Sequence, residues 1–349
     1  MRLERVHFYT GQIIDNYIYA SQSFYNGLIK IDVNTNATSF IGMFPNEKAV
    51  TSVLHRFSYL YKNKIFFIPC DAKNVSVFDI DKQSITPISI NNSYNGGSGQ
   101  KCFFVQDNHL WLIPVSGSGN LVVVNMDDYS VTVRESANTI FGGSTITNIC
   151  QDDKWVYFAR GGDNKVIKYD IENGNTYEIE SSVSGPHSVS KGRDGVWIMN
   201  EKNDSIVFVN EKKETAYMIK EKKYDLLLNV IDYKDGVYAL PHKLENFLRK
   251  EKSDYFEEVD ITSLGIKRYY GYQGAFSYDL IESQDTWYLP PYNVDKMVTI
   301  DKKSGCIGAR KLFFDAPVDI PNEEIKKAVS SGVSSEGMPI DLKTFMEII

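Results

Sequence analysis

The chain has 349 residues and a formal net charge of −7, and 42% of its residues are hydrophobic. This acidic balance argues against nonspecific binding to DNA or to an anionic membrane, because both need a basic surface. No apolar run approaches the ~20 residues that cross a bilayer, and the first residues, MRLERVHFYTGQ, lack a signal-peptide core. We therefore expect a cytoplasmic protein, with no nucleic acid and no membrane among its partners.

The cysteines are few and widely spaced, and they contain no CxxC pair. This spacing argues against a zinc or redox motif and predicts reduced thiols, as is typical of a cytosolic protein. The abundance of Asn, Lys, Ile and Tyr indicates an AT-rich genome, and we expect a bacterial source. The four cysteines are Cys70, Cys102, Cys150 and Cys306.

A short apolar run recurs along the chain, and its second residue marks each copy. Successive marked residues are 40 to 49 positions apart by subtraction. A period of this length, with about four strands in each copy, is typical of a β-propeller blade. We expect the marked side chains to wedge between neighbouring sheets rather than to bind a ligand. They are Ile18, Phe66, Trp111, Tyr157, Trp197, Tyr238 and Trp287.

Residues 155–180 show the organisation of one copy most clearly. Three short runs of alternating apolar and polar residues are separated by two turns, which predicts antiparallel strands. In most copies an Asp or Asn closes the second run, as at Asp32, Asp79 and Asp170, and its side chain is expected to bond the following turn. The sixth copy is degenerate at 246–250.

Taken together, these patterns predict an all-β protein, a seven-bladed β-propeller of four-stranded antiparallel blades. Residues 1–313 form the predicted propeller, and residues 314–349 form a C-terminal tail with short helices, because Pro317 and Pro321 stop strand pairing. The blades are expected at 1–44, 50–90, 101–135, up to 180, up to 220, 226–261 and up to 313.

A propeller gathers two sets of loops at one face of its central channel, and a ligand site is expected there. His187 and His242 fall on that face in adjacent blades, so they are the candidate catalytic residues, as general bases or as ligands of a metal. His7, His55 and His109 have weaker claims. Cationic, polar and aromatic side chains of the same loops are candidates for binding an anionic or sugar-like ligand. These are Lys73, Arg160, Asp163, Asn200, Lys202, Lys243, Tyr269, Tyr272 and Tyr292.

Residues 185–213, GPHSVSKGRDGVWIMNEKNDSIVFVNEKK, resemble the repeat unit of the streptogramin B lyase family. That resemblance covers one blade. It implies a seven-bladed propeller and a magnesium-dependent, eliminative opening of a cyclic depsipeptide, with His187 as the analogue of the family's histidine. Where that family has an acidic residue after the aromatic run, this chain has Asn200, so the carboxylate that the resemblance implies is absent at this position.

Two functions remain open from the sequence. The first is a binding or scaffold protein that holds a polar small molecule, a sugar, or a peptide or protein partner at the loop-rich face. The second is a propeller enzyme, a lyase or hydrolase that uses His187 and His242, with or without a divalent metal such as Mg²⁺.

Overall fold

The structure is a computed structural model of the chain. It divides into two compact units. Unit 1 comprises Met1–Ser89, Leu264–Lys302 and Cys306–Ile349, and unit 2 comprises Ile90–Ser263 and Lys303–Gly305. The structure describes residues 6–315 except 24, 50–52, 91–93, 95–100, 115–119, 135–144, 162–164, 180, 181, 183, 184, 201–204, 211–213, 220–226, 234, 235, 252, 269–273 and 278.

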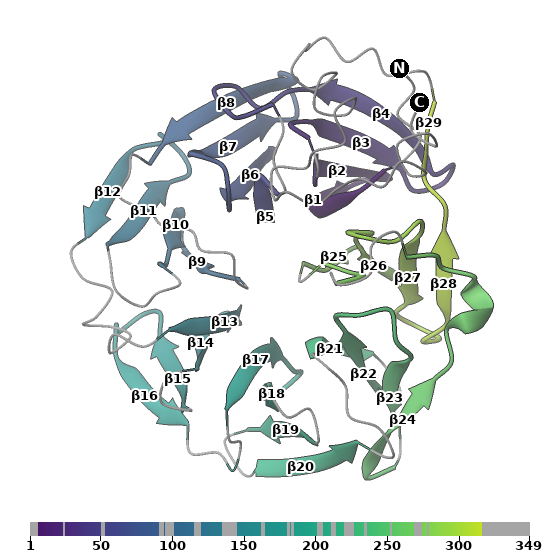
Figure 1. Ribbon diagram of the computed structural model, residues 1–349. Coiled ribbons are helices and arrows are strands. Elements are labelled where there is room, and N and C mark those ends of the chain that lie inside the picture. Colours follow the sequence, from purple (N-terminus) through teal and green to yellow (C-terminus); the bar gives the residue numbers. More distant parts are fainter. Residues whose placement is uncertain are drawn as a thin grey trace. The chain divides into compact units, whose positions relative to one another are not determined.

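Unit 1 contains three antiparallel groups of four strands (Figure 1). A further short strand, β29 (Phe313–Phe314), pairs parallel to the outer strand β4. The three groups are β1 (Phe8–Ile14), β2 (Tyr17–Gln22), β3 (Leu28–Asp32) and β4 (Ala37–Gly42); β5 (His55–Tyr61), β6 (Lys64–Pro69), β7 (Asn74–Asp79) and β8 (Ser84–Ser89); and β25 (Ile281–Glu282), β26 (Thr286–Leu289), β27 (Met297–Asp301) and β28 (Ile307–Arg310).

The described residues of unit 2 form four such groups, two of which join through the parallel pairing of β20 with β24. A 3-10 turn at Thr262–Leu264 follows the last group, and its last residue belongs to unit 1. The groups are β9 (Phe103–Gln106), β10 (His109–Leu112), β11 (Leu121–Asn125) and β12 (Val131–Arg134); β13 (Ile146–Gln151), β14 (Trp155–Arg160), β15 (Lys165–Asp170) and β16 (Thr176–Ile179); β17 (Pro186–Lys191), β18 (Val196–Asn200), β19 (Ser205–Val209) and β20 (Glu214–Ile219); and β21 (Leu227–Tyr233), β22 (Gly236–Pro241), β23 (Phe247–Lys250) and β24 (Tyr255–Val259).

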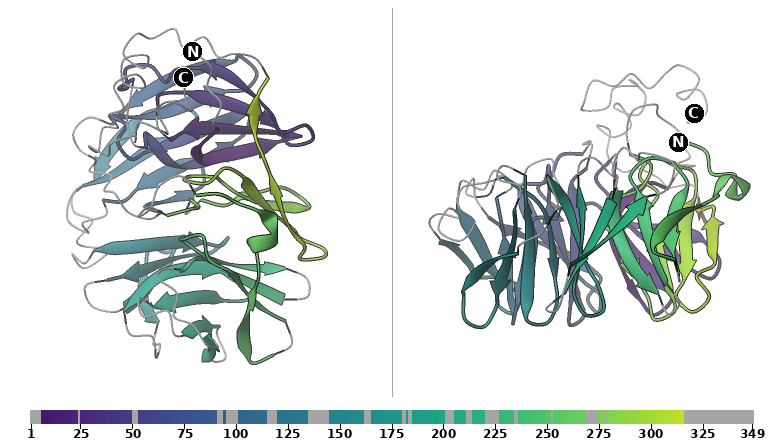
Figure 2. Two further views of the ribbon diagram at one scale, coloured as in Figure 1. Left: turned by 45° about the vertical axis from the view of Figure 1, so that its right-hand side comes forward. Right: turned by 90° about the horizontal axis from the view of Figure 1, so that it is seen from below.

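The sheets are arranged like propeller blades within each unit, as the sequence predicts. The first strand of one sheet lies beside the first strand of the next: β1 beside β5 and β25, and β17 beside β13 and β21. Each sheet is twisted, as the further views show (Figure 2). The seven-blade count and the domain limits 1–313 and 314–349 stay predictions. The helices expected in the tail fall outside the described residues.

The middle strands are apolar on both faces because each sheet packs against a neighbour on either side. In β14, Val156 and Phe158 enter one core, whereas Tyr157 and Ala159 enter the core on the opposite face. The marked residues of the repeat are all buried, from fully covered Phe66 to 7% exposed Trp111. Ile18, Trp111, Tyr157 and Trp197 belong to the packed cores, in agreement with the expected role between sheets.

The acidic turn residues act as the sequence predicts. Asp32 Oδ1 accepts hydrogen bonds from the backbone N–H groups of Asn34 (2.8 Å) and Thr35 (3.3 Å). Asp170 Oδ1 accepts in the same way from residues 172 and 173. The degenerate sixth copy is also a strand, since Phe247–Lys250 pairs with both β22 and β24.

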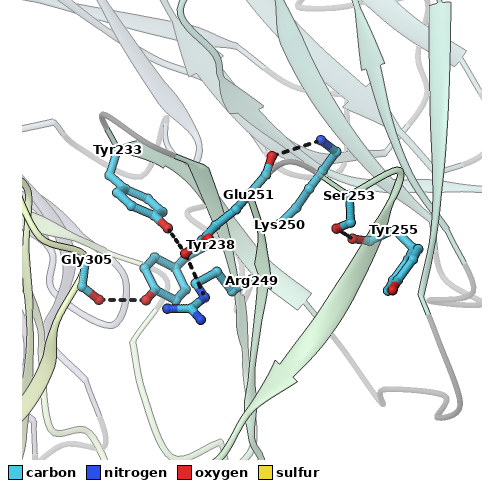
Figure 3. A network of polar contacts seen from close by, with 8 residues as sticks. All are labelled: Tyr233, Tyr238, Arg249, Lys250, Glu251, Ser253, Tyr255 and Gly305. Atoms are coloured by element: carbon cyan, nitrogen blue, oxygen red, sulfur yellow. Dashed lines mark hydrogen bonds and ion pairs between the residues drawn. The ribbon is translucent and has the colours of Figure 1, made fainter.

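A polar network closes the turn end of the sheet that contains β21 and β22 (Figure 3). The Tyr238 hydroxyl donates to the carbonyl of Gly305 (2.6 Å), and the Tyr233 hydroxyl donates to Glu251 (3.3 Å), which also pairs with Arg249 (3.5 Å). Burial, with the neighbouring Tyr238 and Glu251, raises the pKa of Tyr233 to about 12. Two stacked phenol rings and an ion pair thus fix this end of unit 2.

Candidate functional site

The two ends of each sheet differ. At the end that we call the bulge end, the first strand begins and the second strand ends; at the hairpin end, a turn joins these two strands. Five first strands share a register shift close to the bulge end. Such β-bulges redirect a side chain and are enriched beside active sites. The redirected positions are Tyr9 and Arg56 in unit 1, and Thr147, His187 and Leu228 in unit 2.

The two bulge residues of unit 1 lie together with Tyr292 and Cys70, and we call these four residues the Arg56 cluster. The guanidinium carbon of Arg56 lies 5.3 Å from the centre of the Tyr9 ring, and the Tyr9 and Tyr292 rings meet edge-on at 5.1 Å. Burial alone would lower the pKa of Arg56, but Tyr9, Cys70 and Tyr292 outweigh it and raise the pKa. A half-buried, charged guanidinium is therefore held at the bulge end.

A chain of hydrogen bonds fixes the strands beside this cluster. The Thr10 hydroxyl is bonded to Asp279 Oδ2 at 2.5 Å and to Ser58 Oγ at 2.7 Å. Gln12 Nε2 donates to the Ser58 carbonyl at 2.9 Å and to Ser58 Oγ at 3.0 Å. Thr10 is fully buried, so these bonds tie β1 to β5 and to the segment before β25. The backbone that presents Arg56 is held rigidly.

His187 occupies the bulge of β17 in unit 2 and is half-buried. The next residue, Ser188, accepts from Asn148 Nδ2 (3.0 Å) and donates to the carbonyl of Leu228 (2.8 Å). The first strands β13, β17 and β21 are therefore linked next to His187. The sequence-predicted histidine thus sits at a redirected position on a fixed strand.

Arg160 and Asn200 end the second strands of two sheets at the same bulge end, and both are buried. Burial lowers the pKa of Arg160, and Glu178 offsets part of this effect. Asn200 pairs in register with Pro186, one residue before His187. This register places the amide of Asn200 on the strand beside the bulge.

The remaining predicted residues are placed one by one. Lys73 is exposed, and its backbone N–H donates to the Glu47 carboxylate at 2.9 Å. His242 and Lys243 follow β22 directly and are half-buried. The approach of His242 to His187 stays a prediction. The candidates that lie outside the described residues are Asp163, Lys202, Tyr269 and Tyr272.

Sequence reasoning missed Tyr9, Arg56 and Asp279. The signal for Arg56 was present, because it is a lone charge within the first-strand run LHRFSYLY, at the place that His187 takes in its own copy. Its neighbour His55 is a core residue. His55 Nδ1 lies 3.0 Å from Ser21 Oγ, and its ring packs against Phe44 at 4.4 Å. Burial lowers the pKa of His55 to about 3.

Among the described residues, no group of three or more His, Cys, Asp or Glu side chains could hold a metal ion. In the same residues, no helix has the length and apolar character of a membrane span. The bulge ends of the sheets instead present a guanidinium and phenols in unit 1 and an imidazole in unit 2, and such groups bind polar ligands and move protons.

The fold defines the class: the chain is an all-β protein of the β-propeller type. Its similar solved structures include a streptogramin B lyase, with 12% identity and a TM-score of 0.61 over 88% of this chain and 93% of that one. A virginiamycin B lyase from Staphylococcus aureus has 15% identity and a TM-score of 0.61 over 84% and 95%. The extracellular domain of a putative hybrid two-component system from B. thetaiotaomicron has 12% identity and a TM-score of 0.62 over 85% and 41%. These identities show the fold alone. No protein-family model and no curated protein matches the chain.

Proposed function

We propose that the chain is a binding protein that holds a polar ligand, a small molecule, sugar or peptide, at the bulge end of its sheets. The Arg56 cluster is the observation that carries this proposal. A guanidinium that is held over one phenol ring and beside another is oriented before the ligand arrives, which lowers the entropic cost of binding. Its fixed fork of donors suits a carboxylate or phosphate group, and the tyrosines suit a sugar or aromatic face.

Titration calorimetry with sugar acids, neutral sugars and short acidic peptides tests this proposal. Arg56→Gln should weaken binding of the anionic members at least tenfold, because a charge-assisted hydrogen bond is lost. Arg134→Gln is the matched control, since that guanidinium also lies over an aromatic ring, 4.7 Å from Trp111, but on an exposed strand of unit 2. The proposal fails if no compound binds, or if both variants lose affinity equally.

A lyase or hydrolase is the second candidate, favoured by the position of His187 at a β-bulge. An imidazole there is suited to act as a general base. One fold neighbour is a virginiamycin B lyase, described with quinupristin and as catalytically inactive after one histidine is replaced by alanine. The analogous proposal here gives His187 the role of the base, with His242 assisting and with or without a divalent metal such as Mg²⁺.

Incubation with quinupristin, with and without added Mg²⁺, separates the two candidates. Chromatography with tandem mass spectrometry should resolve a ring-opened product of unchanged mass if the chain is a lyase, or one that has gained a water if it is a hydrolase, and His187→Ala should abolish this product. Intact quinupristin after prolonged incubation, together with ligand binding that depends on Arg56, would favour the binding protein.

A further inference from the structure

A cleft of about 760 Å³ lies in unit 2 between the sheet of β13–β16 and the sheet of β17–β20. It opens at the hairpin end: its lining includes Trp155, the first residue of β14, whereas Arg160 ends the same strand at the bulge end. The cleft is therefore separate from the positions discussed above. Its volume falls in the range of small-molecule sites, roughly 300 to 1,000 Å³.

The side chains of the two facing sheets explain why the gap is present. The neighbouring inter-sheet cores of unit 2 each contain four packed aromatic residues. Here β17–β20 contributes short aliphatic side chains to the core, and Val196 and Val209 reach the cleft. These residues pack against Tyr157 and Ala159 of the opposite sheet in the core. They add less volume than the aromatic residues of the other two cores, so space remains at the edge of this core. The aromatic residues of the other two cores are Phe104, Trp111, Phe158 and Tyr169, and Trp197, Phe208, Tyr217 and Phe256.

The opposite wall is aromatic and carries positive charge. The ammonium group of Lys168 lies 3.8 Å from the centre of the Trp155 ring, and that of Lys154 lies 5.0 Å from it. Lys191 lines the cleft from the facing sheet and is exposed. Within the described part of the chain, none of these three lysines forms an ion pair.

Aspartates also line the rim, but the nearest one is occupied. The Asp152 carboxylate accepts from the backbone N–H groups of Lys154 (2.9 Å) and Trp155 (2.7 Å), and from the Tyr157 hydroxyl (3.3 Å). Asp153 and Asp194 are exposed. The lining thus has four cationic side chains, Arg193 included, against three carboxylates, and the ammonium groups of Lys154 and Lys168 lie over the Trp155 ring.

We propose that this cleft is a second binding site, for a small molecule with an aromatic or aliphatic body and an anionic group. The body would pack between Trp155 and the two valines, where it buries apolar area. The anion would lie among Lys154, Lys168 and Lys191, where Coulomb attraction acts beside a low-dielectric wall. This proposal is independent of the ligand at the bulge end.

The probe 8-anilinonaphthalene-1-sulfonate has both parts, and its fluorescence reports binding. The full chain should bind it saturably. The exposed pair Lys154→Gln/Lys191→Gln should weaken binding at least fivefold, and Val209→Phe, which fills the cleft, should weaken it further. Lys250→Gln is the matched control, because its ammonium lies 4.6 Å from the Tyr217 ring but outside the cleft, and it should bind as the wild type does.

The lysine pair decides the outcome if Val209→Phe does not fold, because both lysines are exposed. Unsaturable binding to the wild type, unchanged affinity of the lysine pair, or an equal loss in Lys250→Gln would overturn the proposal. The lysine pair should cause the same loss in an Arg56→Gln background, because that background removes any probe bound at the Arg56 cluster and leaves the cleft unchanged.

Discussion

Acidification is expected to destabilise the protein through His55. Its pKa is about 3 in the folded chain, because burial among Phe44 and Phe67 penalises the imidazolium, whereas the unfolded value is 6.5. Between pH 6.5 and pH 3 the unfolded chain binds a proton that the folded chain does not. Stability is therefore complete above pH 6.5 and falls as the pH drops, by about 1.4 kcal/mol per pH unit.

Urea unfolding at pH 7.5 and pH 4.5 measures this contribution. Between these pH values, the free energy of unfolding of the wild type should fall by about 2.5 kcal/mol more than that of His55→Gln, because glutamine does not titrate. The value at pH 7.5 gives the packing cost of the substitution and is subtracted. His109→Gln, at the start of β10, is the control. Its free energy of unfolding should fall with pH as much as that of the wild type, because His55 is intact. If the wild type and His55→Gln lose stability in parallel, the assignment of His55 as a neutral core residue is refuted.

Three further substitutions test packing, each by thermal and urea unfolding. Tyr238→Phe should cost about 1–2 kcal/mol, because the buried carbonyl of Gly305 loses its donor. Gly305→Ala should cost about 1–2 kcal/mol, since its φ is +69° and a Cβ would lie 2.9 Å from the Tyr233 ring. Asn26→Ala should cost about 2 kcal/mol, because its side chain bonds both the N–H (2.7 Å) and the carbonyl (2.9 Å) of Phe44. Tyr177→Phe, 48% exposed, is the control for loss of a phenol. Stabilities within about 0.5 kcal/mol of the wild type would contradict these contacts.

The strands and their grouping were predictable from the sequence because they depend on local patterns. Alternation in β14 and the Asp170 turn needs only neighbouring residues, and both are as predicted. The fifth strand on the sheet of β1–β4 was not predicted. It forms by parallel pairing of Phe313–Phe314 with Ala37 and Thr38, and no short-range signal marks such a pairing.

The candidate site was less accessible to sequence reasoning. His187 was found because residues 185–187 mark the predicted loop that enters a first strand. Arg56 lacks such a mark, and its importance arises from contact with Tyr9 and Tyr292, which are 47 and 236 residues away by subtraction. The cleft beside Trp155 was also missed. Whether two facing sheets leave a space depends on the side chains of both, and no pattern within one strand predicts it.

The β-bulges allow the side chain at one position of each first strand to differ while the strand pairing stays the same. Because the extra residue of a bulge is left out of the ladder of backbone pairs, its side chain is turned away from the alternation of its neighbours. Tyr9, Arg56, Thr147, His187 and Leu228 are chemically unlike one another, although their strands keep the same register shift. The same backbone irregularity therefore carries a different side chain in each sheet, while the hydrogen-bonded strands around it keep their register.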